Sequence, residues 1–163
     1  MIRALLVVGC LVLFALLLWG MRAGWRHRAA RQPELATPPV APGELGAPRL
    51  APLAGLYVGT AYATSWQDRV VAGGFGLRAA AAISLYEAGA LIEREGASQI
   101  FLPVASIESA RLAPGLAGKV VGAGGLLVIR WEHGGSVLDT AIRADDKSSY
   151  PSWVRTINER VSV

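Results

Sequence analysis

The sequence predicts a mainly β domain with a C-terminal α-helix, preceded by an N-terminal transmembrane helix. Three observations lead to this prediction: an uncharged apolar run near the N-terminus, short alternating segments separated by turn residues after residue 53, and a three- to four-residue apolar period at the C-terminus. A chain of 163 residues has room for one ordinary domain with accessory segments. We expect a transmembrane helix over residues 2–21, a basic flank and proline-rich linker over 22–52, and a folded domain over 53–163.

The N-terminal apolar run has the length of a membrane-spanning helix. No charged residue occurs from Ala4 to Met21, and these 18 residues extend about 27 Å as a helix, close to the roughly 30 Å hydrocarbon core. Trp19 and Trp25 stand where interfacial aromatic residues are usual. A signal peptide would have a shorter apolar region and a small-residue cleavage site. The lipoprotein-like box Val7–Cys10 is followed by further apolar residues, so we expect an uncleaved, single-pass anchor.

Basic residues are concentrated directly after this run. The chain has 16 Lys and Arg against 12 Asp and Glu, but residues 53–163 carry ten of each. Arg22, Arg26, Arg28 and Arg31 follow the span, so the positive-inside rule predicts a cell-membrane protein with its N-terminus outside and its C-terminal domain in the cytoplasm. The same four residues could also hold anionic lipid headgroups. A neutral domain gives no reason to expect a nucleic-acid partner.

The segment 29–52 reads as a linker. It holds six of the nine prolines and has no apolar period, which is typical of a partly polyproline II tether. At about 3.1 Å per residue it could reach roughly 70 Å when extended. We therefore expect the domain to be tethered loosely rather than pressed onto the bilayer.

Short alternating segments after residue 53 predict about seven strands. In "GLRAAAAISLYE", apolar residues from Leu77 to Leu85 share one face; four consecutive alanines leave a helix as the alternative, and the turn that follows favours a strand. "LLVIRWE" and "SVLDTAIRA", joined by "HGGS", form the clearest hairpin, with Asp139 and Arg143 on the polar face of its second strand.

The last segment, "DDKSSYPSWVRTINERV", predicts an amphipathic helix over roughly 149–161. Tyr150, Trp153, Ile157 and Val161 recur at helical spacing, and Pro151 suits a first turn. This apolar stripe has to cover another element, and a curved sheet is the available surface.

About seven short strands capped by one helix is the layout of a pleckstrin-homology-like (PH-like) barrel. The stretches "YVGTAYATSWQDRVVAGGFGLRA", "LAPGLAGKVVGAGGLLVIRW" and "LDTAIRADDKSSYPSWVRTIN" resemble small actinobacterial membrane proteins with a PH-like domain, found near pyrimidine-biosynthesis genes and sometimes labelled export or transporter proteins. The resemblance covers essentially the whole chain. It implies a membrane location and a PH-like fold, and it brings no established activity.

The sequence offers no catalytic or cofactor motif. "APGLAGKVVGAGG" lacks a Walker A loop, because Ala113 takes the place of the first glycine and Val120 that of the Ser or Thr. We interpret it as a flexible glycine-rich connection between strands. "GGFGLRA" fits a dinucleotide-binding pattern without the helix that should follow. One His and no Cys in the domain exclude a Cys–His pair, so we expect no enzyme, no cofactor, no metal and no small-molecule substrate.

Two polar stretches and one lysine form the candidate partner-binding rim, with the indole as anchor. Its residues are Trp66, Asp68, Arg69, Lys119, Arg143 and Asp145. The alternative interpretation is a set of ion pairs and helix caps within the domain.

We expect a membrane-tethered cytoplasmic interaction module that meets a protein partner at the membrane, where tethering raises its effective concentration. An accessory subunit of an export or transport complex is the alternative, although one span cannot form a pore alone. Recognition of an anionic lipid headgroup by the domain has less support, because its first strand–loop–strand carries only Arg69 and Arg78, beside Asp68.

Overall fold

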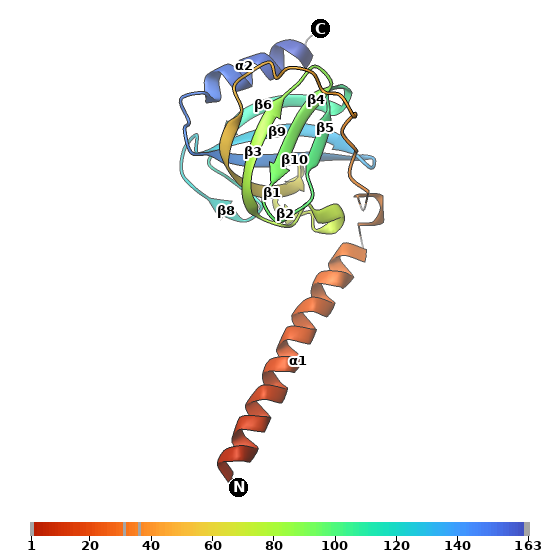
Figure 1. Ribbon diagram of the computed structural model, residues 1–163, viewed down its shortest axis with the longest axis vertical. Coiled ribbons are helices and arrows are strands. Elements are labelled where there is room, and N and C mark those ends of the chain that lie inside the picture. The colour runs from red at the N-terminus through yellow and green to blue at the C-terminus, as the bar shows by residue number, and fades with distance from the viewer. Residues whose placement is uncertain (1, 31, 36, 162–163) are drawn as a thin grey trace.

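The computed structural model consists of a long N-terminal helix and a β-rich domain (Figure 1). It describes residues 2–30, 32–35 and 37–161. Helix α1 (Ile2–Ala30) extends away from the domain, and helix α2 (Tyr150–Val161) lies at the opposite end of the domain from α1. The predicted fold class is therefore confirmed.

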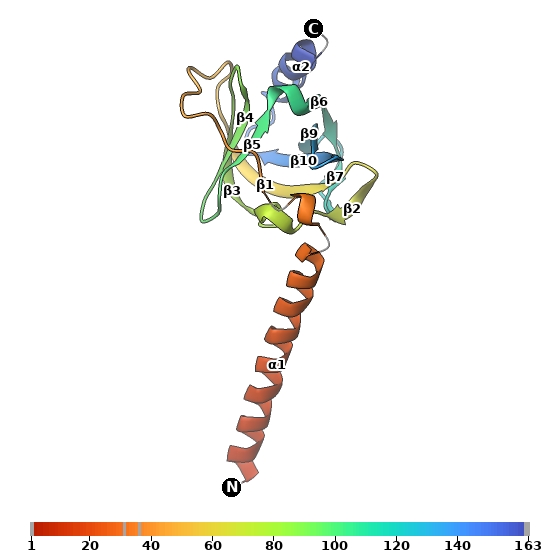
Figure 2. The same cartoon turned by 90° about the vertical axis from the view of Figure 1, so that its right-hand side faces the viewer.

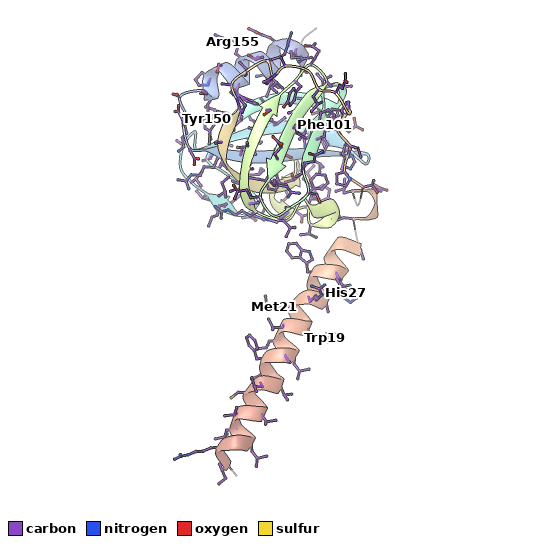
Figure 3. All side chains as sticks on the ribbon, viewed as in Figure 1. Trp19, Met21, His27, Phe101, Tyr150 and Arg155 are labelled. Carbon is purple, nitrogen blue, oxygen red and sulfur yellow. The ribbon has the colours of Figure 1, made fainter. Side chains whose placement is uncertain are left out.

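Helix α1 continues beyond the predicted span. Its 29 residues correspond to about 43 Å, and its segment Leu5–His27 is long and apolar enough to cross a membrane, judged by length and composition. None of that segment is buried against the domain, and Figure 3 shows Trp19, Met21 and His27 projecting from the part of the helix that extends away from the domain. Arg22 and Arg26 lie on its last turns. Arg31 and the side chain of Arg28 lie outside the described residues.

Eight strands form one antiparallel sheet that curves into a barrel-like fold (Figure 2). Seven follow the order β5-β4-β3-β1-β10-β9-β6, and β2 pairs with β1. The strands are β1 (Leu53–Tyr62), β2 (Ser65–Arg69), β3 (Ala79–Leu85), β4 (Gly89–Arg94), β5 (Ile100–Pro103), β6 (Ile107–Ala113), β9 (Leu126–His133) and β10 (Ser136–Ala144). A separate two-stranded hairpin comprises β7 (Gly115–Leu116) and β8 (Lys119–Val120). Short 3-10 turns are η1 (Pro33–Leu35), η2 (Ala72–Gly74) and η3 (Val104–Ser106).

The alanine-rich segment is strand β3 rather than a helix, and β9 and β10 form the predicted hairpin. Leu77 precedes β3 and is half exposed, so it does not share the strand's core face. The predicted polar face of β10 is wrong at Asp139, which is only 2% exposed. Its carboxylate is buried because two arginines on neighbouring strands bind it.

The main core lies inside the barrel, with Tyr57, Phe75 and Trp131 among its large side chains. Helix α2 packs on edge strand β6 and contributes its apolar stripe to this core; Tyr150, Trp153 and Ile157 are buried, whereas Val161 at the helix end is 38% exposed. The carboxamide of Asn158 accepts from the Ala110 N–H at 2.7 Å and donates to the Ala110 carbonyl at 3.0 Å. It thereby takes the place of a neighbouring strand at that residue.

A second apolar cluster lies outside the barrel, under residues 114–125, which we name the glycine-rich flap. Leu116 and Ala117 of the flap cover Val58 on β1, Val128 on β9 and Ala141 on β10. The expectation of a merely flexible connection is therefore wrong, because Leu116 is fully buried and anchors the flap to the sheet.

The start of the linker is docked onto the domain. The Oε1 atom of Gln32 accepts hydrogen bonds from the N–H groups of Val71 at 3.0 Å and Ala72 at 3.2 Å, and Leu35 is 1% exposed within the main core. We call Gln32 and Leu35 the linker clasp. The linker then runs along the domain toward α2 before β1 begins (Figure 1). Near that end Arg49 donates its N–H to the Leu85 carbonyl at 2.7 Å. A loose tether is thus wrong for this linker.

Two glycines leave space for the clasp. Gly73 and Gly134 have φ of +57° and +56°, a region that side-chain-bearing residues rarely adopt. A Cβ atom at Gly73 would collide with the carbonyl oxygen of Leu35, and one at Gly134 would lie 2.5 Å from that of Glu34. Both positions therefore admit the linker backbone only because they lack a side chain.

Candidate interaction surface

Strand β2 and the glycine-rich flap are fastened together. Arg69 donates from Nη2 to the Ala117 carbonyl and from Nη1 to the Gly76 carbonyl, both at 3.1 Å. The Ala117 N–H donates to the Trp66 carbonyl at 2.6 Å. Arg69, a predicted rim residue, therefore uses its guanidinium to hold the flap and the loop before β3. Trp66 is held beside the flap with 44% of its surface exposed.

A hollow of about 330 Å³ lies between β2, the end of β6 and the flap. We call it the Trp66 hollow; its lining residues are Trp66, Arg111, Ala113, Pro114, Gly115 and Val120. Val120 is 70% exposed, the highest exposure among the large apolar residues of the folded domain that the structure describes. The hollow thus presents apolar surface beside one cationic side chain.

Arg111 is positioned by a buried carboxylate. Asp139 on β10 accepts from Arg111 Nη2 at 2.7 Å, and from Nε and Nη2 of Arg130 at 2.9 and 3.0 Å. The Asp139 side chain is 3% exposed, whereas those of Arg111 and Arg130 are 43% and 34% exposed. The hydrogen bond to Asp139 raises the pKa of Arg130. One carboxylate is therefore shared by two guanidinium groups.

The predicted rim residues do not form one site. Trp66, Asp68 and Lys119 lie on β2 and β8 at the end of the domain that faces α1 (Figure 1). Arg143 and Asp145 lie at the other end of β1, since the Asp145 N–H donates to the Ala54 carbonyl, whereas Arg69 pairs opposite Ala61. Seven strand residues separate these positions, or about 23 Å.

Lys119 has no ion pair among the residues that the structure describes, with Asp68 and Asp145 included. Its side chain is exposed on the flap, next to Val120. This leaves its ammonium group accessible to a partner.

Sequence patterns did not indicate that Arg111, Arg130 and Asp139 belong to a candidate site. The signal was present, because oppositely charged residues occur in segments of alternating hydrophobicity. Their meeting depends on which strands are neighbours and in which register, and the structure pairs Asp139 with Arg130 across β10 and β9. A list of strands without their order cannot supply that information.

The polar groups inside the barrel satisfy one another. The Trp131 indole donates to Thr140 at 2.9 Å, Thr140 bonds to Thr60, and Thr60 to the Tyr57 hydroxyl, both at 2.8 Å. Tyr57 donates to the Phe75 carbonyl at 2.7 Å. Burial raises the pKa of Tyr57 to about 12, so its phenol stays neutral. We interpret this network as structural. No cluster of three metal-ligating side chains occurs within residues 2–30, 32–35 and 37–161.

His133 contacts the linker. Its ring stacks on Trp131 with centroids 5.4 Å apart and meets Phe75 edge-on at 6.0 Å, and its Nε2 is buried without a hydrogen-bond partner in the described part of the chain. Burial lowers the pKa of His133, and a hydrogen bond with the Thr37 backbone acts more weakly in the opposite direction. The folded protein therefore favours neutral His133.

This environment predicts a pH dependence of stability. The contribution of His133 to the free energy of unfolding should be complete above about pH 6.5. It should fall as the pH drops below that value, because the unfolded chain then takes up a proton that folded His133 resists, and the fall should end below the folded pKa. Urea unfolding at about pH 8 and about pH 5.5 measures the difference. His133→Gln should reduce it, whereas His27→Gln on exposed α1 should not; an unchanged difference in His133→Gln would contradict the assignment.

Comparison with known proteins places this arrangement in a family. A family model described as "Bacterial PH domain-like" matches residues 35–158, about three quarters of the chain. No curated protein and no solved structure matched the chain. The match begins at Leu35, the clasp residue that enters the core. The chain therefore belongs to the bacterial PH domain-like family.

Proposed function

We propose that this is a single-pass cell-membrane protein whose cytoplasmic PH-like domain is a non-catalytic interaction module held close to the bilayer. The observation that carries the proposal is the junction between α1 and the domain. Helix α1 ends at Ala30, and the clasp residues Gln32 and Leu35 follow two and five residues later in the chain. The PH-like fold supports an interaction role at a general level.

The length of α1 supports a short distance between bilayer and domain. Crossing a hydrocarbon core of about 30 Å leaves about 13 Å of the helix beyond it. Trp25, in that last part, contacts the loop before β3, since a Cβ atom on Gly76 would lie 2.9 Å from its Cζ2. The domain would therefore begin within the headgroup region.

The end of the domain nearest to the bilayer carries exposed apolar and basic residues. β2, η2 and β8 lie at this end (Figures 1 and 2). Leu77 and Val120 are 50% and 70% exposed, and Arg78 and Lys119 are exposed beside them in the chain. Arg22 and Arg26 on α1 favour a cytoplasmic location for this end. A partner confined to the same membrane would meet it at a raised effective concentration.

Two single-cysteine variants test this proposal in a Cys10→Ala background. Val120→Cys lies at the α1 end, and Arg155→Cys lies on α2 at the far end, where Figure 3 places Arg155. Both positions are exposed. A membrane-impermeant maleimide should label both in inside-out vesicles and neither in right-side-out vesicles.

The same variants measure distance from the bilayer. In nanodiscs with Ni-chelating lipid headgroups, a spin label at position 120 should relax faster than one at position 155. Labelling in right-side-out vesicles would refute the orientation, and equal relaxation would refute the proximity. A stoichiometric multi-span protein in mild-detergent preparations would instead favour an accessory subunit of an export or transport complex.

A further inference from the structure

We propose that the Trp66 hollow binds the C-terminal residue of a protein partner, with its apolar side chain against Trp66 and Val120 and its carboxylate against Arg111. This inference rests on the proposed role of the domain as an interaction module. To that role it adds the chemistry of the segment that the partner presents, and it identifies Arg111 as the residue that would recognise this segment.

The apolar part of the ligand follows from the lining of the hollow. Trp66 and Val120 expose 44% and 70% of their surfaces there, and Ala113 and Pro114 complete the wall. Partly exposed aromatic residues of this kind are common anchors of protein interfaces. A volume of about 330 Å³ lies at the lower end of the usual range of ligand pockets, about 300–1,000 Å³, and accommodates one apolar side chain with its terminal carboxylate.

The charge of the ligand follows from Arg111, the one charged residue among those lining the hollow. Asp139 is shared by the guanidinium groups of Arg111 and Arg130, and of these two only Arg111 lines the hollow, so it is the group placed to attract an anion there. Only Nη2 of Arg111 is engaged within the described part of the chain, by Asp139.

A carboxylate suits this site better than a phosphate group. A guanidinium binds one carboxylate through two parallel hydrogen bonds. A phosphate monoester carries a charge of about −1.5 to −2 at neutral pH and is usually held by several cationic groups. Here one cation lines the hollow, and Asp139 lies behind it at 2.7 Å. Asp139 would act as a positioning residue that holds the guanidinium at the wall before the ligand arrives.

The test uses the full chain in phosphatidylcholine nanodiscs with 5-fluorotryptophan in place of its five tryptophans. Trp66→Phe assigns the Trp66 fluorine resonance. The probes are N-acetyl-Ala-Leu with a free carboxylate and the same peptide as its amide. We expect the acid to shift the Trp66 resonance and the amide to bind about tenfold more weakly, the size of effect that a charge-assisted hydrogen bond gives.

Variants assign the two parts of the ligand. Arg111→Gln should reduce binding of the acid to that of the amide, Arg111→Lys should retain part of the preference, and Arg155→Gln on α2 should change nothing. Val120→Ser should weaken acid and amide equally, and its exposure makes a folding defect unexpected.

Several results would overturn the inference. They are the absence of a Trp66 shift at millimolar peptide, equal binding of acid and amide, and an unchanged acid preference in Arg111→Gln and Arg111→Lys. In matched nanodiscs that contain phosphatidylserine, a Trp66 shift without peptide, together with no shift by the acid peptide in phosphatidylcholine, would replace the protein partner with a lipid one. Each of these results can occur in a protein that shows the proposed orientation and distance from the bilayer in the labelling experiments. A negative peptide-binding result is therefore distinct from failure of the proposed function.

Discussion

Replacing Arg94 with alanine is expected to lower the free energy of unfolding by about 3 kcal/mol or more, because several buried hydrogen bonds to a charged donor are lost at roughly 1.5–3 kcal/mol each. Arg94 is 7% exposed. Its Nη1 donates to the carbonyls of Gly74 at 2.8 Å and Leu77 at 3.1 Å, and its Nε to that of Ser98 at 2.8 Å. The guanidinium carbon lies 4.9 Å above the centre of the Tyr57 ring.

The environment of Arg94 explains why the loss should be large. Its positive charge is balanced by carbonyl dipoles and an aromatic face rather than by a carboxylate in the described part of the chain. Burial accordingly lowers the pKa of Arg94. Without the side chain, the loop that contains η2 loses the group that fixes its carbonyls, and those carbonyls lose their donor.

Urea unfolding of the full chain in nanodiscs, followed by tryptophan fluorescence, measures the loss. Arg78→Ala is the matched control, since Arg78 is exposed at the end of the same loop and should change stability by no more than about 0.5 kcal/mol. The loss of stability in Arg94→Lys should lie between those of the two alanine variants, because an ammonium group lacks the planar arrangement of N–H donors of a guanidinium group. Equal unfolding midpoints for Arg94→Ala and Arg78→Ala would show that the loop does not depend on Arg94.

Leu35→Ala is expected to weaken the attachment of the linker by about 2–5 kcal/mol, the usual cost of truncating a buried leucine. Leu35 is 1% exposed and belongs to the main core with Phe75. The substitution leaves a cavity under a segment that otherwise has few apolar contacts. If the linker opens locally at a lower free energy than the whole domain unfolds, the free energy of that local opening is the most that Leu35→Ala can remove.

Hydrogen exchange of residues 32–39 and of the loop around η2 measures this effect. Exchange should become faster in both segments, because the Val71 and Ala72 N–H groups bond to Gln32 in the clasp. Val40→Ala in the same linker is the control, since Val40 is 84% exposed. Unchanged protection in Leu35→Ala would mean that Gln32 alone fastens the linker.

Local patterns in the sequence were sufficient for much of the fold. The apolar run of α1, the "HGGS" hairpin and the period of α2 each depend on neighbouring residues, and the structure confirms all three. The clasp could not be predicted in this way. Leu35 is a single apolar residue in a proline-rich segment, and its burial depends on gaps at Gly73 and Gly134, far away in the chain.

The candidate site, too, could be predicted only where it depends on local sequence patterns. Trp66 and Lys119 were identified as exposed residues of distinctive chemistry, and the structure brings their segments together at the flap. Arg111 was not identified, because its importance comes from Asp139, 28 residues later, which the alternating pattern placed on a solvent-facing side. Burial of that carboxylate depends on strand order and register.

The route of the linker gives the molecule a mechanical property. Under the proposed membrane anchoring, a pull that separates the domain from the bilayer would act first on the clasp, because β1 starts near the α2 end. The intact clasp would transmit this tension into the part of the core nearest α1 and would keep the domain close to the bilayer. Rupture of the clasp would free the 16 residues 33–48, up to the Arg49 attachment, and at about 3.1 Å per residue this segment could extend to roughly 50 Å. The domain would then have two maximum distances from the membrane, a short one with the clasp closed and a longer one with the clasp open. The contacts around Leu35 would set the force needed to pass from the first to the second.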